Sequence, residues 1–281
     1  MDTIRTENRG KFQFRLVRMK NDYVGVVNRM AGGQIARIDG QDPDDVWHRL
    51  LLAAGQASPD YFGFDGAVAR FREHCPAGFE DPYYISQERA YKDKARTTLD
   101  RTLPLSAVLE GRRGLGEPAS QVFNATNLVD PREKMPMARF LRGTDADTFV
   151  LAAARFAADG SEAALWDMSK VLRKHDLAKW TIATYLPFLW RPDQHMFLKP
   201  EVTKDFATRV GDRFVDDYET ALNISVYRSL LDLATRTSQE LTRAGMPPHD
   251  NIDVQSFVWV VGKYGEAASR VAPERIGGAS A

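Results

Sequence analysis

The chain has a single cysteine, Cys75, among its 281 residues. One thiol excludes an internal disulfide framework and any zinc site built from several cysteines. It also suits a reducing compartment, so we expect a cytoplasmic location. No run of about 18 apolar residues occurs, and the charged first residues lack the apolar middle of a signal peptide. We therefore expect no membrane partner.

Several motifs of nucleotide and metal chemistry are also missing. The chain has no phosphate loop of the Walker type, no Gly-x-Gly-x-x-Gly after a strand and no His-Glu-x-x-His. It lacks the His-x-Glu and Cys-x-x-Cys pair of zinc deaminases. None of the five histidines pairs with another four residues away. We therefore expect no metal site and no cofactor.

Charge of neither sign is in excess. Lys and Arg number 38, as do Asp and Glu, which argues against a strongly basic coat or an acidic tail. Two segments are mildly positive. Residues 111–142 hold six basic against three acidic residues, and residues 166–213 hold nine against six. A modest basic patch on the surface is compatible with this distribution.

Hydrophobic patterning divides the chain into two regions. Residues 11–38 contain three apolar runs of period two, separated by turn residues. A helix is expected to begin near Asp42-Pro43, and from residue 60 onward apolar residues recur three and four positions apart. We therefore predict an α+β, mostly α fold, with a small antiparallel β-sheet plus helix over residues 1–58 and a helical domain over residues 59–281.

Individual helices follow from the same spacing. The pattern predicts helices over residues 179–188, 202–210 and 218–243, among others. Asp145 and Ser161 are expected to cap the helices that follow them, because their side-chain oxygens can accept from the first backbone N–H groups.

The stretch 179–204 is the densest in chemistry-bearing residues, combining large aromatic side chains, lysines and a carboxylate in a helix–loop–helix pattern. A core helix followed by a buried connection accounts for this composition. A ligand site accounts for it as well.

Within this stretch, Trp180-Thr181 is followed about twenty residues later by Phe197-Leu198-Lys199-Pro200-Glu201. The pattern resembles helix-hairpin-helix DNA glycosylases, especially the 3-methyladenine glycosylase subgroup. There, a Trp-Thr pair opens the second hairpin helix, and the catalytic carboxylate begins the next helix. Thr126-Asn127-Leu128-Val129 is similar to that family's wedge element. Residues 176–178 read Asp-Leu-Ala where the family's hairpin reads Gly-x-Gly, and Glu201 stands where the family has aspartate.

The resemblance implies a helical body of that family's type and a monofunctional DNA glycosylase. Such an enzyme flips a modified base out of double-stranded DNA and hydrolyses its N-glycosidic bond without strand cleavage. Glu201 takes the catalytic place, beside Trp180 across a concave pocket, and stabilises the sugar as it gains oxocarbenium character. Asp205 and Asp253 are the other candidate catalytic acids. A monomer is expected, and the identity of the base stays open.

Further residues receive roles from the same resemblance. The base pocket would be formed by Trp180, Tyr185, Trp190, His195 and Gln255. The expected DNA contacts are Arg112, Arg113, Asn127, Leu128, Lys179, Lys199 and Lys204. The apolar wedge that fills the vacated stack would be Leu128 or Leu115.

Other interpretations stay open. The basic loop 111–116 either grips a phosphate through its arginines and backbone N–H groups or is a solvated turn. Asp253 and Gln255 are either site residues or the cap and first-turn amide of a helix. Two rival functions follow. One is a non-catalytic protein- or nucleic-acid-interaction protein, and the other is a different nucleotide-acting enzyme that uses Lys199, Asp253 and Gln255.

Overall fold

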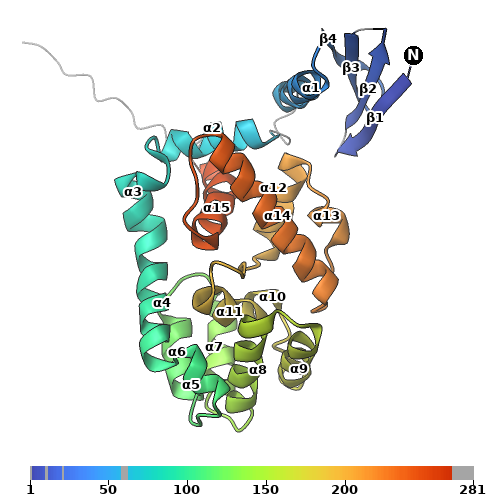
Figure 1. Ribbon diagram of the computed structural model, residues 1–281. Coiled ribbons are helices and arrows are strands. Elements are labelled where there is room, and N and C mark those ends of the chain that lie inside the picture. Colours follow the sequence, from blue (N-terminus) through green and yellow to red (C-terminus); the bar gives the residue numbers. More distant parts are fainter. Residues whose placement is uncertain (1, 10–11, 21, 58–62, 268–281) are drawn as a thin grey trace, which may run out of the picture.

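The structure is a computed structural model that describes residues 2–9, 12–20, 22–57 and 63–267 (Figure 1). Its N-terminal part is one antiparallel sheet with strand order β1-β2-β3-β4. The strands are β1 (Asp2–Arg9), β2 (Phe12–Met19), β3 (Asp22–Arg29) and β4 (Gln34–Gly40). The prediction of antiparallel strands is confirmed, but it omitted β1. This edge strand carries one large apolar residue, Ile4, and that residue is exposed, so it gives no alternating signal.

One helix, α1 (Pro43–Ala57), covers the sheet and begins where Asp42-Pro43 indicated. The carboxylate of Asp42 accepts from the backbone N–H of Asp44 at 2.8 Å, which satisfies a donor that the helix leaves unpaired. Val46 and Leu50 of α1 are fully buried, one turn apart on the face that meets the sheet. A separate small core forms here from residues of β2, β3 and α1, namely Phe12, Phe14, Leu16, Val27, Val46, Trp47, Leu50 and Ala54.

The rest of the described chain is helical, which confirms the α+β, mostly α fold class. The predicted division between residues 58 and 59 lies outside the described residues. The helical body begins with α2 (Gly63–His74), the short turn η1 (Gly78–Glu80), α3 (Pro82–Tyr84), the π-helical turn η2 (Ile85–Arg89), α4 (Ala90–Thr102), α5 (Leu105–Leu109), α6 (Gly116–Asn124) and α7 (Pro131–Phe140). It continues with α8 (Ala146–Asp159), α9 (Glu162–Arg173), α10 (Trp180–Ala183), α11 (Tyr185–Trp190), α12 (Pro200–Val210), α13 (Phe214–Asp217), α14 (Ile224–Arg243) and α15 (Asn251–Ala267).

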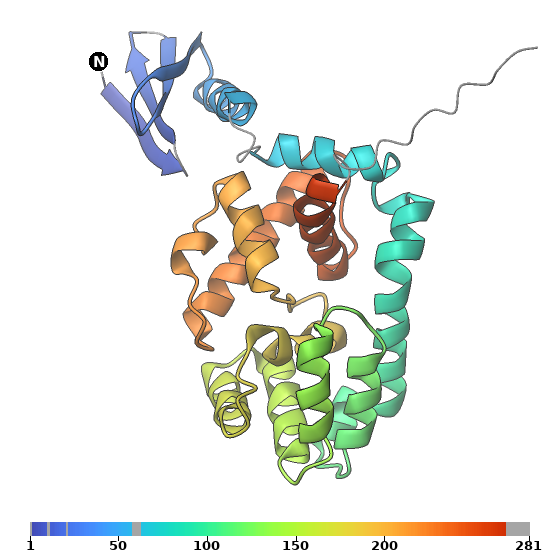
Figure 2. The same ribbon diagram turned by 180° about the vertical axis from the view of Figure 1, so that it is seen from behind.

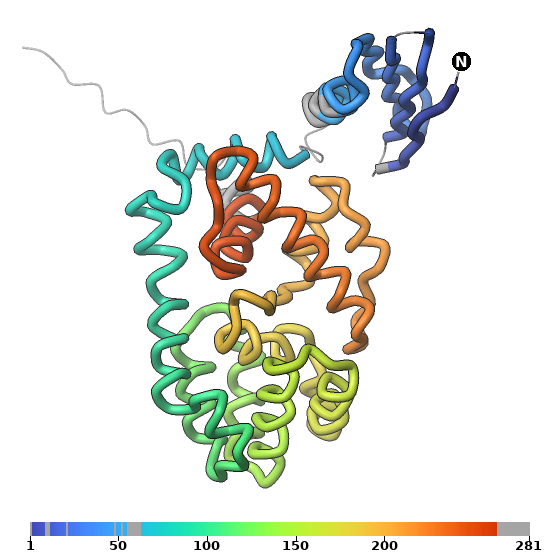
Figure 3. The backbone as a smooth tube through the Cα atoms, in the orientation of Figure 1, coloured from blue at the N-terminus to red at the C-terminus, as the bar shows by residue number. Residues whose placement is uncertain are grey.

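The helical body has two tiers (Figures 1 and 2). The tier nearer the sheet contains α2, α12, α14 and α15, and the far tier contains α5 to α9. Helix α4 runs along one side, as the backbone trace shows, and α10 and α11 lie between the tiers (Figure 3). One continuous apolar core runs through both tiers. The aromatic-rich segment therefore lies at the centre of the body.

Two predicted helices are shorter than expected because polar side chains interrupt them. Residues 179–188 form α10 and α11 in place of one helix. The hydroxyl of Thr184, at their junction, donates to the carbonyl of Trp180 at 2.6 Å and accepts from the N–H of Leu198 at 3.0 Å. The helix predicted over residues 218–243 begins at Ile224, because the Asn223 side chain caps it through the N–H of Ser225 at 2.9 Å.

One of the two predicted caps is confirmed. The hydroxyl of Ser161 accepts from the N–H of Ala164 at 3.2 Å, at the start of α9. Asp145 precedes α8 but makes no side-chain capping bond, so this prediction is wrong. Its carboxylate instead bonds the imidazole of His175 at 3.0 Å, on the turn after α9. Asp145 therefore bonds a distant side chain, His175, in place of the backbone N–H groups of α8.

Gly116 at the start of α6 offers a test of this packing. A Cβ placed there would lie 2.0 Å from the carbonyl oxygen of Leu141 and 2.9 Å from the Cβ of Ala146, where the backbone would have to move. We expect Gly116→Ala to lower the free energy of unfolding by about 2 kcal/mol, as overpacking does. Urea denaturation measures this. The exposed Gln121→Ala on the same helix is the control, and equal midpoints for the two variants would contradict the packing described.

Candidate functional site

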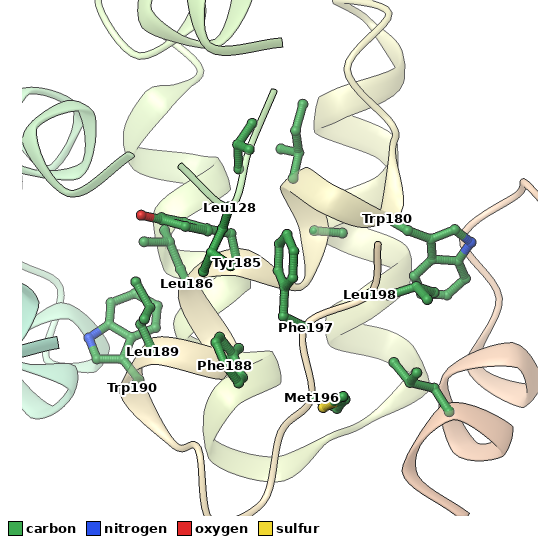
Figure 4. Close-up of a cluster of buried hydrophobic side chains, with 14 of the residues drawn as sticks. Leu128, Trp180, Tyr185, Leu186, Phe188, Leu189, Trp190, Met196, Phe197 and Leu198 are labelled. Carbon is green, nitrogen blue, oxygen red and sulfur yellow. The ribbon is translucent and has the colours of Figure 1, made fainter. Parts of the chain in front are cut away.

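The aromatic side chains expected to hold a flipped base are part of the core. Trp180, Tyr185 and Trp190 have exposed fractions of 2%, 0% and 5%. Figure 4 shows them in one buried cluster, with Trp180 and Trp190 at opposite ends. The two indole N–H groups donate to the carbonyls of Glu219 and Leu103, each at 2.9 Å. Rings this enclosed stabilise the fold and do not offer a face to a base in this conformation.

His195, also expected in the base pocket, is buried between two helices. Its Nε2 lies 3.1 Å from the carbonyl oxygen of Ala157, so this nitrogen carries the proton. Its Nδ1 then accepts from the hydroxyl of Tyr227 at 2.8 Å. Burial lowers the pKa of His195, which keeps the ring neutral. Both ring nitrogens are occupied by the fold, so His195 acts as a structural link between α8 and α14.

The predicted wedge residues are also buried. Leu128 and Leu115 are almost fully enclosed, and Figure 4 shows Leu128 beside Tyr185 within the cluster. The loop that carries Leu128 is anchored by Thr126, whose hydroxyl lies 2.8 Å from that of Tyr185. Its neighbour Asn127 is exposed at the surface. Neither leucine is placed to enter a base stack unless the segment that carries it rearranges.

Glu201 lies where the sequence predicted along the chain, in the first turn of α12 directly after Pro200. Its side chain is 86% exposed and pairs with Lys204 at 2.8 Å. Trp180 is buried, so the two residues do not share a concave pocket. Asp205 points to the surface too and pairs with Arg209 at 2.9 Å.

The basic loop between α5 and α6 is closed by a carboxylate of the protein itself. The backbone N–H groups of Gly114 and Leu115 donate to Asp147 at 2.9 and 2.7 Å. These are the donors that the phosphate-binding interpretation required. The loop, with Arg112 and Arg113, lies at the end of the helical body opposite α12 (Figures 1 and 2). The structure therefore does not bring these arginines together with Lys204.

The turn between α9 and α10 contains residues 176–178, which the resemblance compares with a glycine-rich hairpin. Asp176 adopts a left-handed backbone with φ of 56°, the conformation that glycine favours. At the end of this turn, Glu133 of α7 accepts from the hydroxyl of Thr181 at 2.8 Å and pairs with Lys179 at 3.2 Å. An internal carboxylate thus lies at the end of this turn.

A surface that we call the basic face surrounds the loop 126–130 and the start of α12. It is formed by Arg132, Lys134, Lys179, Lys199 and Lys204. The ammonium groups of Lys134 and Lys199 donate to two carbonyls of this loop, those of Thr126 and Leu128, the latter at 3.4 Å. The basic face is mixed in charge, because Asp130, Glu133 and Glu201 lie on it.

Aromatic rings hold two of these lysines in place. The ammonium of Lys199 lies 4.3 Å from the ring centre of Trp259, and that of Lys204 lies 4.9 Å from the ring centre of Tyr218. The indole of Trp180, which follows Lys179, donates to the carbonyl of Glu219, which follows Tyr218. This hydrogen bond links the segment that carries Lys179 to the segment that contacts Lys204. Cation–π contacts of this kind contribute roughly 0.5–1 kcal/mol at exposed sites.

Asp253 is the centre of a different polar cluster, the Asp253 network, which also contains Tyr84, Arg89, His249 and Asp250. One oxygen of the fully buried Asp253 carboxylate accepts from the Tyr84 hydroxyl and from Arg89 at 2.6 Å. The other accepts from the backbone N–H and Nδ1 of His249 at 2.8 and 2.9 Å. Arg89 also forms a bidentate pair with Asp250. The network joins the start of α15 to η2.

The pKa of Asp253 reports the strength of this environment. Burial on its own would raise the pKa of the carboxyl, but the hydrogen bonds from Tyr84, His249 and Arg89 outweigh it, and the pKa is lowered. The capping interpretation of Asp253 is wrong, because Asp250 accepts from the first-turn N–H of Ile252 at 2.9 Å and takes that role. Asp253 is an interior anion that ties three helical segments together.

A buried lysine lies next to the Asp253 network. The ammonium of Lys92 on α4 donates to the hydroxyl of Ser256 at 2.6 Å and lies 3.5 Å from the carboxylate of Glu88. Burial lowers the pKa of Lys92 to about 8. Glu88 and Arg89 lie on the π-helical turn, and such turns occur frequently at functional sites. Lys92 itself is fully enclosed, so a substrate does not reach it in this conformation.

The three residues of the rival enzyme interpretation are not brought together. Asp253 and Gln255 are two positions apart on α15, so their side chains point roughly 200° apart around the helix. Asp253 faces η2. Trp259, one turn after Gln255, contacts Lys199 at the start of α12. Gln255 is buried, and its side-chain oxygen has no hydrogen-bond partner. Gln255 and Lys199 are thus on one side of α15, and Asp253 is on another.

Sequence reasoning missed most of the Asp253 network. Tyr84, Arg89 and Lys92 lie more than 150 positions before their partners, so no local spacing indicates the contact. One short-range contact belongs to it, between His249, just before α15, and Asp253, four residues later in its first turn.

Comparisons of the chain with protein-family models, with curated proteins and with solved structures find no match. Within the described residues, no three or more histidine, cysteine, aspartate or glutamate side chains are grouped to hold a metal ion. None of the helices in the described part of the chain has the length and apolar character needed to cross a membrane.

Asp253→Asn tests the Asp253 network. We expect it to lower the free energy of unfolding at neutral pH by about 3 kcal/mol, because Arg89 loses a buried anion. The folded-state pKa of Asp253 is lowered, so its contribution is present above the unfolded pKa and is lost as the pH falls through the folded value. The difference from wild type should therefore shrink on acidification, as measured by urea denaturation.

Asp93→Asn is the matched control, because Asp93 also pairs with Arg89, at 3.1 Å, but its side chain is half exposed. Its effect should stay below about 1 kcal/mol. If both variants lost a similar free energy of unfolding, the buried carboxylate of Asp253 would contribute no more to stability than the half-exposed Asp93.

Proposed function

We propose that the protein binds double-stranded DNA through the phosphates of its backbone, on the basic face. The single observation that supports this function is the gathering of five cations around the loop 126–130, on α7, before α10 and at the start of α12. A surface of this kind suits a duplex, since phosphate contacts come from side chains on a face and do not need a pocket.

The geometry supports moderate affinity. The basic face carries five cations and three acids, so its surplus is two charges. Each lysine ammonium has three donors, and the bond from Lys134 to Thr126 uses one of them. Burial lowers the pKa of Lys134. The Lys134 ammonium donates to the neutral carbonyl of Thr126, so the oxygen of a bound phosphate would supply a negative charge that this carbonyl does not. The aromatic contacts of Lys199 and Lys204 restrict their side chains, which reduces the entropy lost on binding.

The combined variant Lys179→Gln/Lys199→Gln/Lys204→Gln tests this function. We expect it to weaken binding to a labelled duplex at low salt by about tenfold, equivalent to about 1.4 kcal/mol. The slope of log affinity against log salt should become shallower, because fewer counterions are released. Fluorescence anisotropy over a range of salt concentrations gives both quantities.

Arg112→Gln/Arg113→Gln/Arg142→Gln is the control, as it removes the same charge from exposed positions away from the basic face. It should leave affinity nearly unchanged. If the two variants weaken binding equally, the contact is non-specific attraction to net charge. Absence of duplex binding by the wild-type protein at low salt would refute the proposal.

We further propose, as a second candidate, that DNA held on the basic face undergoes base excision. The observation that favours it is the position of Glu201, which begins α12 within the basic face and is open to a bound strand. A carboxylate there would stabilise positive charge on the sugar. The enclosed aromatic residues provide no base pocket in this conformation, so excision would require the cluster of Figure 4 to open.

Glu201→Gln tests excision separately from binding. Duplex affinity should stay equal or rise slightly, because an anion leaves the basic face. Base release from DNA that carries assorted modified bases, followed by mass spectrometry, should fall by about tenfold. Asp193→Asn, which removes an exposed carboxylate outside α12, is the control and should keep its activity. Wild-type protein that binds DNA but releases no base would leave binding as the function.

A further inference from the structure

A hollow of about 710 Å³ lies between α9 and the start of α14. This volume falls within the range of about 300–1,000 Å³ that ligand pockets occupy. Its walls are apolar, formed by Leu165, Leu222 and Ile224, and its rim carries Glu162 and Arg173. In Figure 1, the start of α14 and the segment that precedes it lie on the side of the helical body that also holds α9. None of its lining residues was singled out by the sequence.

Trp166 is the main feature of this hollow. Its side chain is 51% exposed, in contrast to the enclosed Trp180 and Trp190. An indole that stays open to water on a helix surface forgoes the burial that usually stabilises this residue. The guanidinium of Arg173 lies 5.4 Å from its ring centre and the ammonium of Lys170 lies 6.0 Å away. Lys170 is paired with Asp167 at 2.8 Å and lies outside the lining, so the hollow presents an open aromatic ring and one cation, Arg173.

These groups match the parts of a nucleotide. A base can stack on the Trp166 ring and against the leucine side chains, and its phosphate can then pair with Arg173. The carboxylate of Glu162 can accept a hydrogen bond from an exocyclic amino group of the base. An apolar molecule would use the ring and the walls but would leave the guanidinium of Arg173 without an anionic partner.

The hollow is next to the basic face. Trp180, directly after Lys179, donates to the carbonyl of Glu219, and the hollow begins at Ala221, two residues further along. Tyr218, which holds Lys204, is on the same segment. A strand that leaves a duplex bound on the basic face therefore reaches the hollow within a short length of backbone.

We propose that this hollow binds an unpaired nucleotide of a DNA single strand, with its base on Trp166 and its phosphate at Arg173. The proposal rests on the proposed DNA binding and extends it from duplex DNA to duplex–single-strand junctions. It assigns the recognition of an unpaired base to α9 and α14, away from the buried aromatic cluster.

Two labelled probes test the assignment, a blunt duplex and the same duplex with a mixed-sequence single-stranded overhang. The wild-type protein should bind the overhang probe more tightly. Trp166→Ala should remove about fivefold or more of affinity for the overhang probe, the lower end of what loss of a base–aromatic stack produces. Its affinity for the blunt duplex should not change. Trp166→Phe keeps an aromatic ring and should retain most of the preference.

Arg173→Gln provides a second variant that leaves the apolar packing of α9 intact. It should also weaken overhang binding selectively. Unchanged far-UV circular dichroism and melting temperature would show that each variant is folded.

The outcomes separate the two proposals. Failure of the wild-type protein to bind either probe overturns DNA binding and this site together. Duplex binding without a preference for the overhang, or a preference that survives both Trp166→Ala and Arg173→Gln, overturns the nucleotide site alone. Equal weakening of both probes by Trp166→Ala also overturns it, because the residue would then not distinguish an unpaired base.

Discussion

The helical body depends on one buried carboxylate. Asp253 on α15 receives hydrogen bonds from Tyr84 at the end of α3, from Arg89 on η2 and from His249 before α15. These segments lie far apart in sequence, and apolar packing on its own would fix their separation but not their register. A charge taken out of water is tolerated only where donors surround it, so the network specifies a single arrangement of α4 against α15. The π-helical turn that aims Arg89 at Asp253 is part of this arrangement.

Internal carboxylates also decide where a phosphate can bind. Asp147 accepts from the backbone N–H groups of the basic loop, and Glu133 contacts Thr181 and Lys179 after the turn between α9 and α10. Each takes the position that an anionic ligand was expected to take, and each is covalently part of the chain and so always present. An external phosphate must compete with them or use other donors. Cations that donate to neutral carbonyls, such as Lys134, are better partners for a phosphate, and they lie around the loop 126–130.

The fold could be predicted from the sequence further than the site could. Period-two runs gave β2, β3 and β4, and the start of α1 followed from Asp42-Pro43, because those signals are local. The site depends on which side chains are enclosed, and this is decided by contacts between distant segments. Glu201 was predicted correctly to lie in the first turn of α12. Nothing local indicated that Trp180 would be buried, with its indole N–H donating to the carbonyl of Glu219. Arg89 and Lys92 gave no signal, since their partners follow about 160 positions later.

The contrast between Trp166 and the buried aromatic residues has a local cause. Residues 180–190 are mostly apolar and all buried, which is typical of a segment enclosed in the core. Helix α9 is amphipathic, and its buried residues are Ala164, Leu165, Met168, Ser169, Val171 and Leu172. Trp166 falls outside that stripe, so the period of the helix directs a large ring toward water. An aromatic residue that departs from its own helix's apolar face is therefore a better indicator of a binding site than an aromatic-rich run, because only the former leaves a ring available to a ligand.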